Sequence, residues 1–472
     1  MQWRIGVSAY RRACSKAKRF SVASCGCHIR QGRIGSDSRH AQKSTRPNAD
    51  TSTRRHVDTP TRRHAHTPIP LFESPNLFRR LDLMTPRAAA RTLVGEYSEG
   101  SVVDFAKSLR NELGTNASLG FLFVTQEWRP HLEETLELVR LHGHVSYVAG
   151  CSGSGVIGCR KEVEQRPGMS ALLLSLPAES FSVFEITESD AESSAGPESW
   201  HGFTGLTPKD LTSWIVLANP YFTGAEDWLA EWSLAYPGIP TIGGLASARN
   251  SETFLLHDGA VSQTAALAIA LKGGLVVHPL VSQGCRPIGD AVPITKVEDN
   301  LILEIGNLPA YQALEAAFFS IPAQERLAVQ NNLFLGLAAT EYVEDFQQGD
   351  FLIRNILGAD PKVGAVAVGA YPRGGQTVQF QLRDFRSAHQ DLLTVAQRAK
   401  NEASNAFGIL LFSCAGRGKG LFGVTDHDAM ILADAFRDMP LAGVFCNGEI
   451  GPVGGKPFLH GYTASAAILC AR

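Results

Sequence analysis

Short apolar segments alternate with amphipathic helical segments after residue 100, and this alternation most restricts the possible fold. Leu119–Val124 is typical of a buried strand, Leu132–Leu141 of an amphipathic helix, and Val145–Ala149 of a second strand. A strand, a helix and a strand in that order form a βαβ unit. The apolar residues of Ser101–Leu113 recur at helical spacing up to Gly114, which predicts a preceding helix. The sequence therefore predicts an α/β protein.

The same pattern continues through the rest of the first half. An acidic, small-residue stretch at Asp190–Ser199 predicts a surface loop, and Gly224–Ala235 predicts a helix. The predicted strands are Ser170–Leu176, Phe181–Ile186, Trp214–Ala218, Ala265–Leu271 and Leu275–Leu280.

A second set of strands and helices begins near residue 300. Ala310–Phe319, Ser387–Ala403 and Asp426–Arg437 have helical patterns. Two further runs, Val363–Val368 and Val378–Leu382, predict a hairpin around a Pro-Arg-Gly-Gly turn. The other predicted strands are Ile302–Ile305, Leu333–Ala338, Phe351–Ile356, Ile409–Cys414, Leu441–Cys446 and Ala464–Leu469. We therefore expect two layered sheet-and-helix domains, at 84–300 and 301–472.

Residues 1–83 differ from the rest of the chain in charge. They carry 17 Lys and Arg against 5 Asp and Glu, whereas the remainder carries 27 basic against 41 acidic residues. Low hydrophobicity with high net charge predicts a disordered basic extension. Three roles stay open: binding to nucleic acid or an anionic surface, an organellar transit peptide, and a dispensable extension. Nucleic-acid binding is disfavoured because the segment lacks interleaved aromatic residues.

Cysteine usage and hydropathy predict a cytoplasmic protein. The nine cysteines are odd in number and spread along the chain, which fits reduced, mostly buried thiols. No uninterrupted apolar run reaches the ~18 residues of a membrane span. The first residues also lack the apolar centre of a secretory signal. We therefore expect no membrane partner.

A glycine motif follows the strand Val145–Ala149. Gly153–Gly158 spells G-x-G-x-x-G, which in dinucleotide-binding folds brings backbone N–H groups onto a pyrophosphate at a helix N-terminus. Here the chain reaches Pro167 before a good helix can form. We interpret the motif as a tight turn and predict no cofactor. No His, Asp or Glu set has metal-ligand spacing, so we predict no metal site either.

Several ordered motifs resemble those of proteins that carry a FIST N domain followed by a FIST C domain. The resemblance spans roughly residues 100–470, and its C-terminal motifs are the stronger ones. The motifs are Val148–Gly155, Ile242–Ser247, the junction-like Gln283–Gly289, Leu382–Asp384, Phe412–Gly418 and Phe445–Pro452. The resemblance implies a sensory module that binds small ligands such as amino acids. The chain carries no recognisable kinase, receptor span or F-box, so signalling would pass through a partner protein.

Polar residues follow the predicted strands of the C-terminal half, where strand ends meet at one edge of a sheet. An arginine there would hold a carboxylate in bidentate fashion, and Glu449 would receive an ammonium, a combination suited to an amino acid. Arg286 and Arg354 are further candidates with weaker support. The alternative is that Arg383–Asp384 and Arg417–Glu449 are structural ion pairs. The candidate ligand-binding residues are Arg383, Asp384, Ser413, Arg417, Asn447, Glu449, Arg286 and Cys151.

Cys151 supports a competing hypothesis. It follows a predicted strand, so it could act as a nucleophile if His257 or His460 lay near it as a base. A packed thiol is the simpler interpretation. The main hypothesis is therefore a cytoplasmic receptor for a small polar metabolite. A cysteine- or carboxylate-dependent enzyme and a protein-interaction scaffold stay open as alternatives.

Overall fold

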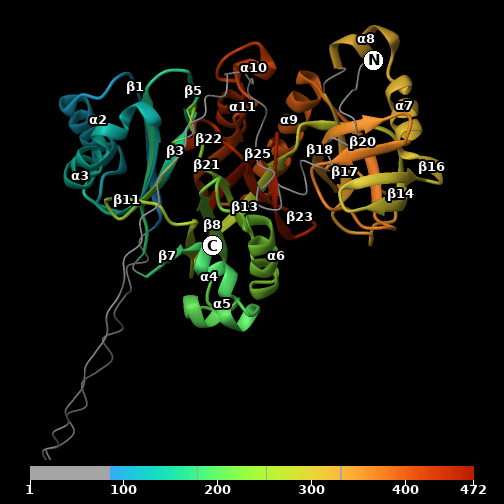
Figure 1. Ribbon diagram of the computed structural model, residues 1–472. Helices are drawn as coiled ribbons and strands as arrows, with labels where there is room; N and C mark the ends of the chain where they lie inside the picture. The colour runs from blue at the N-terminus through green and yellow to red at the C-terminus, as the bar shows by residue number, and fades with distance from the viewer. Residues whose placement is uncertain (1–84, 178, 251, 330–331) are drawn as a thin grey trace, which may run out of the picture. The chain divides into compact units, whose positions relative to one another are not determined.

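The computed structural model describes residues 85–472 apart from 178, 251 and 330–331, with all their side chains except those of 327–329. The predicted disordered extension at 1–83 lies outside the described residues. Within them the chain forms four sheets with their covering helices, which confirms the predicted α/β class (Figure 1). None of the helices in this part of the chain has the length and apolar character needed to cross a membrane.

The first sheet, here called the β1 sheet, contains the predicted βαβ unit. Strands β2 (Ala117–Thr125) and β3 (Val145–Gly153) pair in parallel and are joined by η1 (Gln126–His131) and α3 (Leu132–Gly143). The apolar sides of α2 (Glu99–Leu113) and α3 pack together on one face of this sheet. Its strand order is β1 (Arg87–Val94), β6 (Gly168–Ser175), β2 (Ala117–Thr125), β3 (Val145–Gly153), β10 (Leu255–His257) and β11 (Ala260–Ser262).

The second sheet, the β8 sheet, corrects one prediction. Residues 190–193 end α4 (Glu188–Ser193), residues 197–199 begin α5 (Pro197–Thr204), and only residues 194–196 of the predicted loop lie outside a helix. Thr187 and Asp190 make a capping box that begins α4, and α5 buries Trp200 against α6 (Ala225–Ala235). The strand order is β24 (Lys456–His460), β23 (Glu449–Val453), β9 (Thr241–Leu245), β8 (Ser213–Ala218), β12 (Ala266–Leu271) and β7 (Phe181–Ile186).

The third sheet, the β21 sheet, shows what the glycine motif does. Gly153–Gly158 forms the end of β3 and the strand β4, and no helix follows it. A Cβ at Gly158 would lie 1.8 Å from Thr92 Oγ1, so the glycine permits close packing of two sheets. Helix α9 (Phe385–Glu402) leads into β21, whereas α10 (Lys419–Phe422) and α11 (His427–Phe436) connect β21 with β22. The strand order is β13 (Leu275–Ser282), β25 (Ala464–Ala471), β21 (Ala406–Cys414), β22 (Leu441–Cys446), β4 (Gly155–Gly158) and β5 (Lys161–Glu164).

The fourth sheet, the β14 sheet, closes on itself because β14 also pairs with β15. The predicted hairpin of Val363–Val368 and Val378–Leu382 is wrong. Strand β19 pairs with β18 and β15, whereas β20 pairs with β14 and β17. The segment between β19 and β20 therefore joins two strands that β17 and β18 separate in the sheet. Helices α7 (Ala310–Ser320) and α8 (Ala323–Val329) accompany it. The strand order is β14 (Cys285–Glu298), β20 (Thr377–Arg383), β17 (Leu333–Ala338), β18 (Phe351–Asp360), β19 (Ala365–Val368), β15 (Leu301–Ile305) and β16 (Leu308–Pro309).

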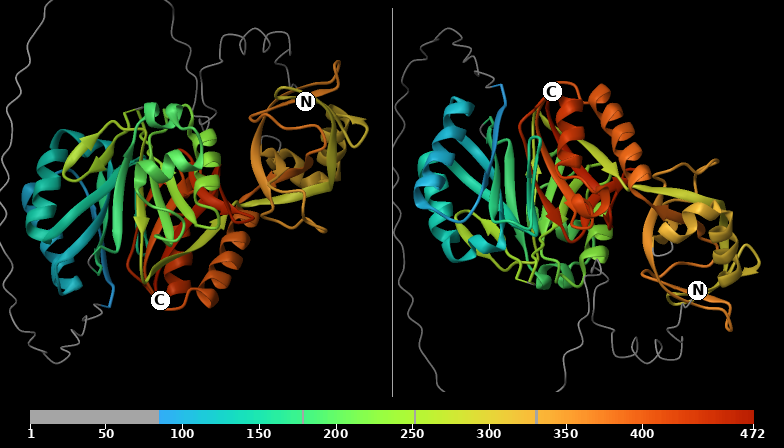
Figure 2. Two further views of the ribbon diagram at one scale, coloured as in Figure 1. Left: turned by 90° about the horizontal axis from the view of Figure 1, so that it is seen from below. Right: turned by 90° about the horizontal axis from the view of Figure 1, so that it is seen from above.

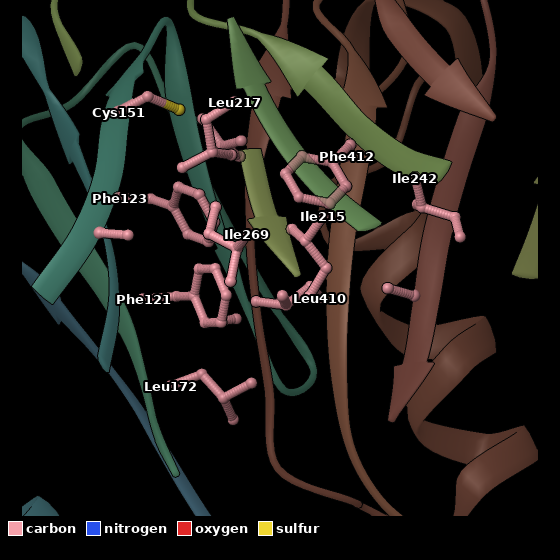
Figure 3. Packing of buried hydrophobic residues seen from close by; sticks show 14 of the residues in the cluster. Phe121, Phe123, Cys151, Leu172, Ile215, Leu217, Ile242, Ile269, Leu410 and Phe412 are labelled. Carbon is pink, nitrogen blue, oxygen red and sulfur yellow. The ribbon is translucent and has the colours of Figure 1, made fainter. Parts of the chain in front are cut away.

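Strands from both sides of residue 300 share two of these sheets. In the β21 sheet, β4 pairs with β22, and in the β8 sheet, β9 pairs with β23. A common apolar layer then joins the sheets: Phe121 and Phe123 face Phe412 and Ile215 across it (Figure 3). The two halves of the sequence therefore depend on one core.

Glycines at the centres of parallel pairs let neighbouring strands approach closely, and we expect Gly150→Ala to be destabilising. A Cβ at Gly150 would lie 1.8 Å from the carbonyl oxygen of Leu122, a backbone atom that cannot move aside without distorting β2. Forcing an extra methyl group into a packed interior costs about 1–3 kcal/mol. Urea denaturation measures the loss of unfolding free energy.

The control for Gly150→Ala is Gly202→Ala in helix α5, where an added Cβ meets nothing within 4 Å. Alanine is the better helix former, so this variant should be unchanged or more stable by up to about 1 kcal/mol. Equal stability of Gly150→Ala and the wild type would show that β2 and β3 are not packed as described.

Candidate functional site

A cavity of about 1310 Å³ lies between helix α9 and the chain that leads from β13 into β14. Figure 2 shows α9 in orange-red, beside the red C-terminal strands and next to the orange strands of the β14 sheet. Sites for small molecules are typically concave, with volumes of about 300–1000 Å³. This cavity therefore has room for an elongated small molecule.

Local sequence fixes the two walls of the cavity against each other. Asp384 begins α9 as its N-cap, since its Oδ1 accepts a hydrogen bond from the Ser387 N–H at 2.8 Å. About two turns further along the helix, Asp391 Oδ2 accepts from Ser282 Oγ at 2.7 Å and from the Gly284 N–H at 3.0 Å. Gly284 has φ +68, which lets the chain turn from β13 into β14.

Arg383 is the buried cation of the cavity wall. It ends β20, only 8% of it is exposed, and it lines the cavity. Its Nη2 donates to the carbonyl oxygen of Gly416 at 2.9 Å, and its guanidinium lies 4.7 Å from the ring centre of Tyr462. Its Nε has no hydrogen-bond partner among the described residues. The guanidinium also makes no ion pair with a described carboxylate, so its charge would gain from an anionic ligand that reaches the exposed part of the side chain.

Arg286 and Asp384 form an ion pair at the same end of the cavity. Arg286 Nε lies 3.3 Å from Asp384 Oδ2, and its Nη2 lies 3.1 Å from Glu325 Oε2 in α8. Arg383, Asp384 and Arg286, three of the residues expected from the sequence, therefore do line one cavity. Asp384 pairs with Arg286, which replaces the alternative in which it pairs with Arg383.

Ser413 and Arg417 lie in a buried network instead of lining the cavity. The side chains of Arg417 and Asp428 are fully buried, with Nε to Oδ2 at 2.6 Å and Nη2 to Oδ1 at 2.9 Å. Ser413 Oγ donates to the same carboxylate at 2.9 Å. Burial alone would raise the pKa of Asp428, but the Arg417 guanidinium and His427 hold it well below its usual value.

Glu449 and Asn447 also lie outside the cavity lining. Glu449 is fully buried, and its Oε2 accepts from the Thr463 N–H at 3.1 Å. Burial, with a smaller contribution from Cys414, raises the pKa of Glu449 well above its usual value. A neutral carboxyl is a poor partner for an ammonium, so Glu449 does not suit the role expected for it. Asn447 follows β22, and its backbone N–H donates to Leu245 O.

Cys151 lies in the apolar core, away from the residues that line the cavity. Its sulfur sits among Phe123, Leu217 and their neighbours (Figure 3), and 1% of the residue is exposed. Burial raises the pKa of its thiol far above the usual value, which opposes formation of a nucleophilic thiolate. Of the two histidines considered as bases, His257 lies near Glu185 and His460 contacts Gly451 O.

Sequence reasoning missed two residues of the site. Asp391 lies seven residues after Asp384, so both fall on one side of α9, and this helical spacing could have identified it. Tyr462 stacks under Arg383 from a segment that no local pattern connects with β20. Arg354, a weaker candidate, donates to Leu459 O at 3.3 Å and pairs with Glu226 at 3.4 Å. Throughout residues 85–472, with the gaps given above, no three His, Cys, Asp or Glu side chains are placed to hold a metal ion.

Comparisons with known proteins agree with these sequence motifs. The FIST N domain matches residues 118–307, and the FIST C domain matches residues 310–452. Uncharacterised proteins of Mycobacterium tuberculosis and Mycobacterium bovis are each 35% identical over 378 residues, which cover 78% of this chain and 95% of the relative.

Among solved structures, the cyanuric acid hydrolase of A. caulinodans aligns with 82% of this chain and 99% of its own. Its sequence identity is 11% and its TM-score 0.29. A second cyanuric acid hydrolase structure aligns with a TM-score of 0.28 and 10% identity, covering 81% of this chain and 100% of its own. Similarity at this level supports no inference about activity.

Proposed function

We propose that this chain, a member of the family of proteins that join a FIST N domain to a FIST C domain, is a receptor for a small metabolite. The metabolite would carry a carboxylate. The ligand would occupy the cavity between α9 and the β13–β14 chain. Amino acids are the class that the sequence motifs suggested first. The observation that carries the proposal is the largely buried guanidinium of Arg383, which lines the cavity and makes no ion pair with any described carboxylate.

The chemistry of the cavity supports recognition of an anion. A guanidinium presents its N–H groups in a plane that matches a carboxylate, and a charge-assisted hydrogen bond in a partly dry site is stronger than one in water. The stacking of Tyr462 and the hydrogen bond to Gly416 O hold Arg383 in place before a ligand arrives. This preorganisation lowers the entropy that binding must overcome.

Signalling would pass to a separate protein partner, and the receptor would act in the cytoplasm. A reducing compartment suits the six described cysteines, which form no disulfide with one another and five of which are buried. The competing enzyme hypothesis loses support from Cys151, because a buried thiol with a raised pKa makes a poor nucleophile.

The proposal predicts that Arg383→Gln weakens carboxylate binding about 10- to 100-fold, the loss expected when a charge-assisted hydrogen bond is removed. Thermal-shift measurements on the full chain against amino acids, matched carboxylic acids and matched amines would identify binders, and calorimetry would then give the dissociation constants. Carboxylic acids should raise the melting temperature of the wild type, whereas amines without a carboxylate should not.

Two variants control for Arg383→Gln. Arg373→Gln replaces an exposed arginine in the turn before β20 and should bind like the wild type. Arg383→Lys keeps the charge but loses the planar fork, so it should bind with intermediate affinity. The receptor proposal fails if no carboxylate stabilises the wild type, or if Arg383→Gln binds as tightly as the wild type.

A further inference from the structure

The two walls of the cavity run side by side in opposite directions. Asp384, at the start of α9, pairs with Arg286 of β14. Asp391, further along the helix, binds Ser282 at the end of β13. Val395 and Arg398 come later still, and with Pro279 they line both the cavity and a smaller hollow of about 290 Å³. Residues later in α9 therefore lie further along the cavity from Asp384.

At the end of the cavity near Asp384, the described residues leave Arg383 without an anionic partner. Its acidic groups already have partners: Asp384 contacts Arg286 and the Ser387 N–H, and Asp391 accepts from Ser282 and Gly284. Arg383, the most buried cation of this end, makes no ion pair with a described carboxylate. A ligand that brings a negative charge satisfies this end, whereas an ammonium would have to compete with hydrogen bonds that are already made.

The opposite stretch is lined by apolar side chains from three elements. Val281 lies on β13, Val395 on α9, and Pro452 and Val453 on β23. The strands β13 and β23 are in close contact here, since a Cβ added at Gly451 would lie 2.7 Å from Val281 Cγ2. The polar neighbours Thr394 and Arg398 are exposed, and the apolar side chains of this stretch gain from burying hydrocarbon.

The distance between the two ends exceeds the length of a small amino acid. From Asp384 to Val395 the helix advances by eleven residues, which at the rise of an α-helix is about 16 Å. A glycine- or glutamate-sized ligand held at Arg383 would leave the apolar stretch filled with water.

We infer that the ligand is an anionic amphiphile: a carboxylate bound at Arg383 that carries an unbranched apolar chain along Val281, Val395 and Val453. This inference rests on the proposed function, because it assumes that the same cavity binds a carboxylate. It narrows the ligand from polar metabolites in general to acyl-chain carboxylates.

A series of N-acylglycines tests the inference with a constant head group. Calorimetry on the full chain would compare N-acetyl-, N-butyryl-, N-hexanoyl- and N-octanoylglycine, each below the concentration at which it forms micelles. Each methylene that becomes buried should tighten binding up to about fourfold. We expect the affinity to rise at least about 30-fold from the acetyl to the octanoyl compound.

Two variants on α9 test where the apolar chain of the ligand lies. Val395→Gln places an amide in the apolar stretch and should weaken octanoylglycine binding about tenfold while leaving acetylglycine binding unchanged. Leu393→Gln alters an exposed leucine on the same helix that does not line the cavity, and should leave both affinities unchanged.

The outcomes separate this inference from the receptor proposal. If short carboxylates bind but chain length has no effect, or if Val395→Gln and Leu393→Gln behave alike, the amphiphile inference is wrong and the receptor proposal stands. If no N-acylglycine and no other carboxylate binds the wild type, both fail.

Discussion

Asp428→Asn is expected to lower the free energy of unfolding by about 3–5 kcal/mol, because it leaves the Arg417 guanidinium as an unpaired charge in the interior. Both side chains are fully buried, and the carboxylate accepts both Arg417 hydrogen bonds and that of Ser413. The same carboxylate also contacts Nδ1 of His427 at the start of α11. Loss of its charge therefore affects β21, the following turn and α11 together.

Urea denaturation at pH 7 would measure this loss, and a double-mutant cycle would assign it to the pair. Arg417→Met should add little in the Asp428→Asn background, since the interaction is already broken. Asp434→Asn is the matched control, because Asp434 pairs with Arg160 at the surface and its side chain is 65% exposed. That variant should leave the unfolding midpoint unchanged. Equal midpoints for Asp428→Asn and Asp434→Asn would contradict the buried pair.

Hydrophobic spacing in the sequence was sufficient for most helices and strands of the fold. The apolar residues of α2 and α3 recur at 3.6-residue spacing because one side of each helix packs on the β1 sheet. The apolar positions in the sequence therefore mark the buried side of each helix. Strands buried on both faces, such as β2 and β21, appear as continuous apolar runs for the same reason.

Pairing between distant strands could not be predicted in this way. Nothing local indicates that β4 at Gly155–Gly158 pairs with β22 at Leu441–Cys446, or that β19 and β20 avoid the adjacent pairing. Such choices depend on which long-range pairs bury the most surface, and a single sequence without related sequences does not display them. The acidic stretch at 190–199 misled for another reason: a capping box and one buried tryptophan outweighed its composition.

The candidate site divided along similar lines. Of the residues proposed from strand ends, Arg383 and Asp384 line one cavity together with Arg286. The sequence did not show which of these residues line the cavity. Arg417 and Glu449 follow predicted strands as Arg383 does, but they are completely buried. The partner of Arg417 was also missed: Asp428 is eleven residues away on a different element, whereas Glu449 is held by Thr463.

His460 and Glu449, which face each other across β23 and β24, should give stability opposite dependences on pH. Burial lowers the pKa of His460 to about 4, below the ~6.5 of an exposed histidine. The unfolded chain then binds the extra proton first. The contribution of His460 to stability is therefore fully present above pH 6.5 and is lost as the pH drops towards 4. Burial raises the pKa of Glu449, so its contribution is complete below about 4.5 and falls as the pH rises.

Single variants separate the two effects. Each pKa unit corresponds to about 1.4 kcal/mol, so the wild type should lose about 3 kcal/mol relative to His460→Gln between pH 7 and pH 4. Glutamine can still donate to Gly451 O, which His460 Nε2 contacts at 3.0 Å, but it cannot be protonated. Glu449→Gln should act in the other direction and gain stability over the wild type as the pH rises above 5. Urea denaturation across this range measures both differences. Parallel curves for the wild type and His460→Gln would mean that His460 is protonated in the folded protein as readily as in the unfolded chain.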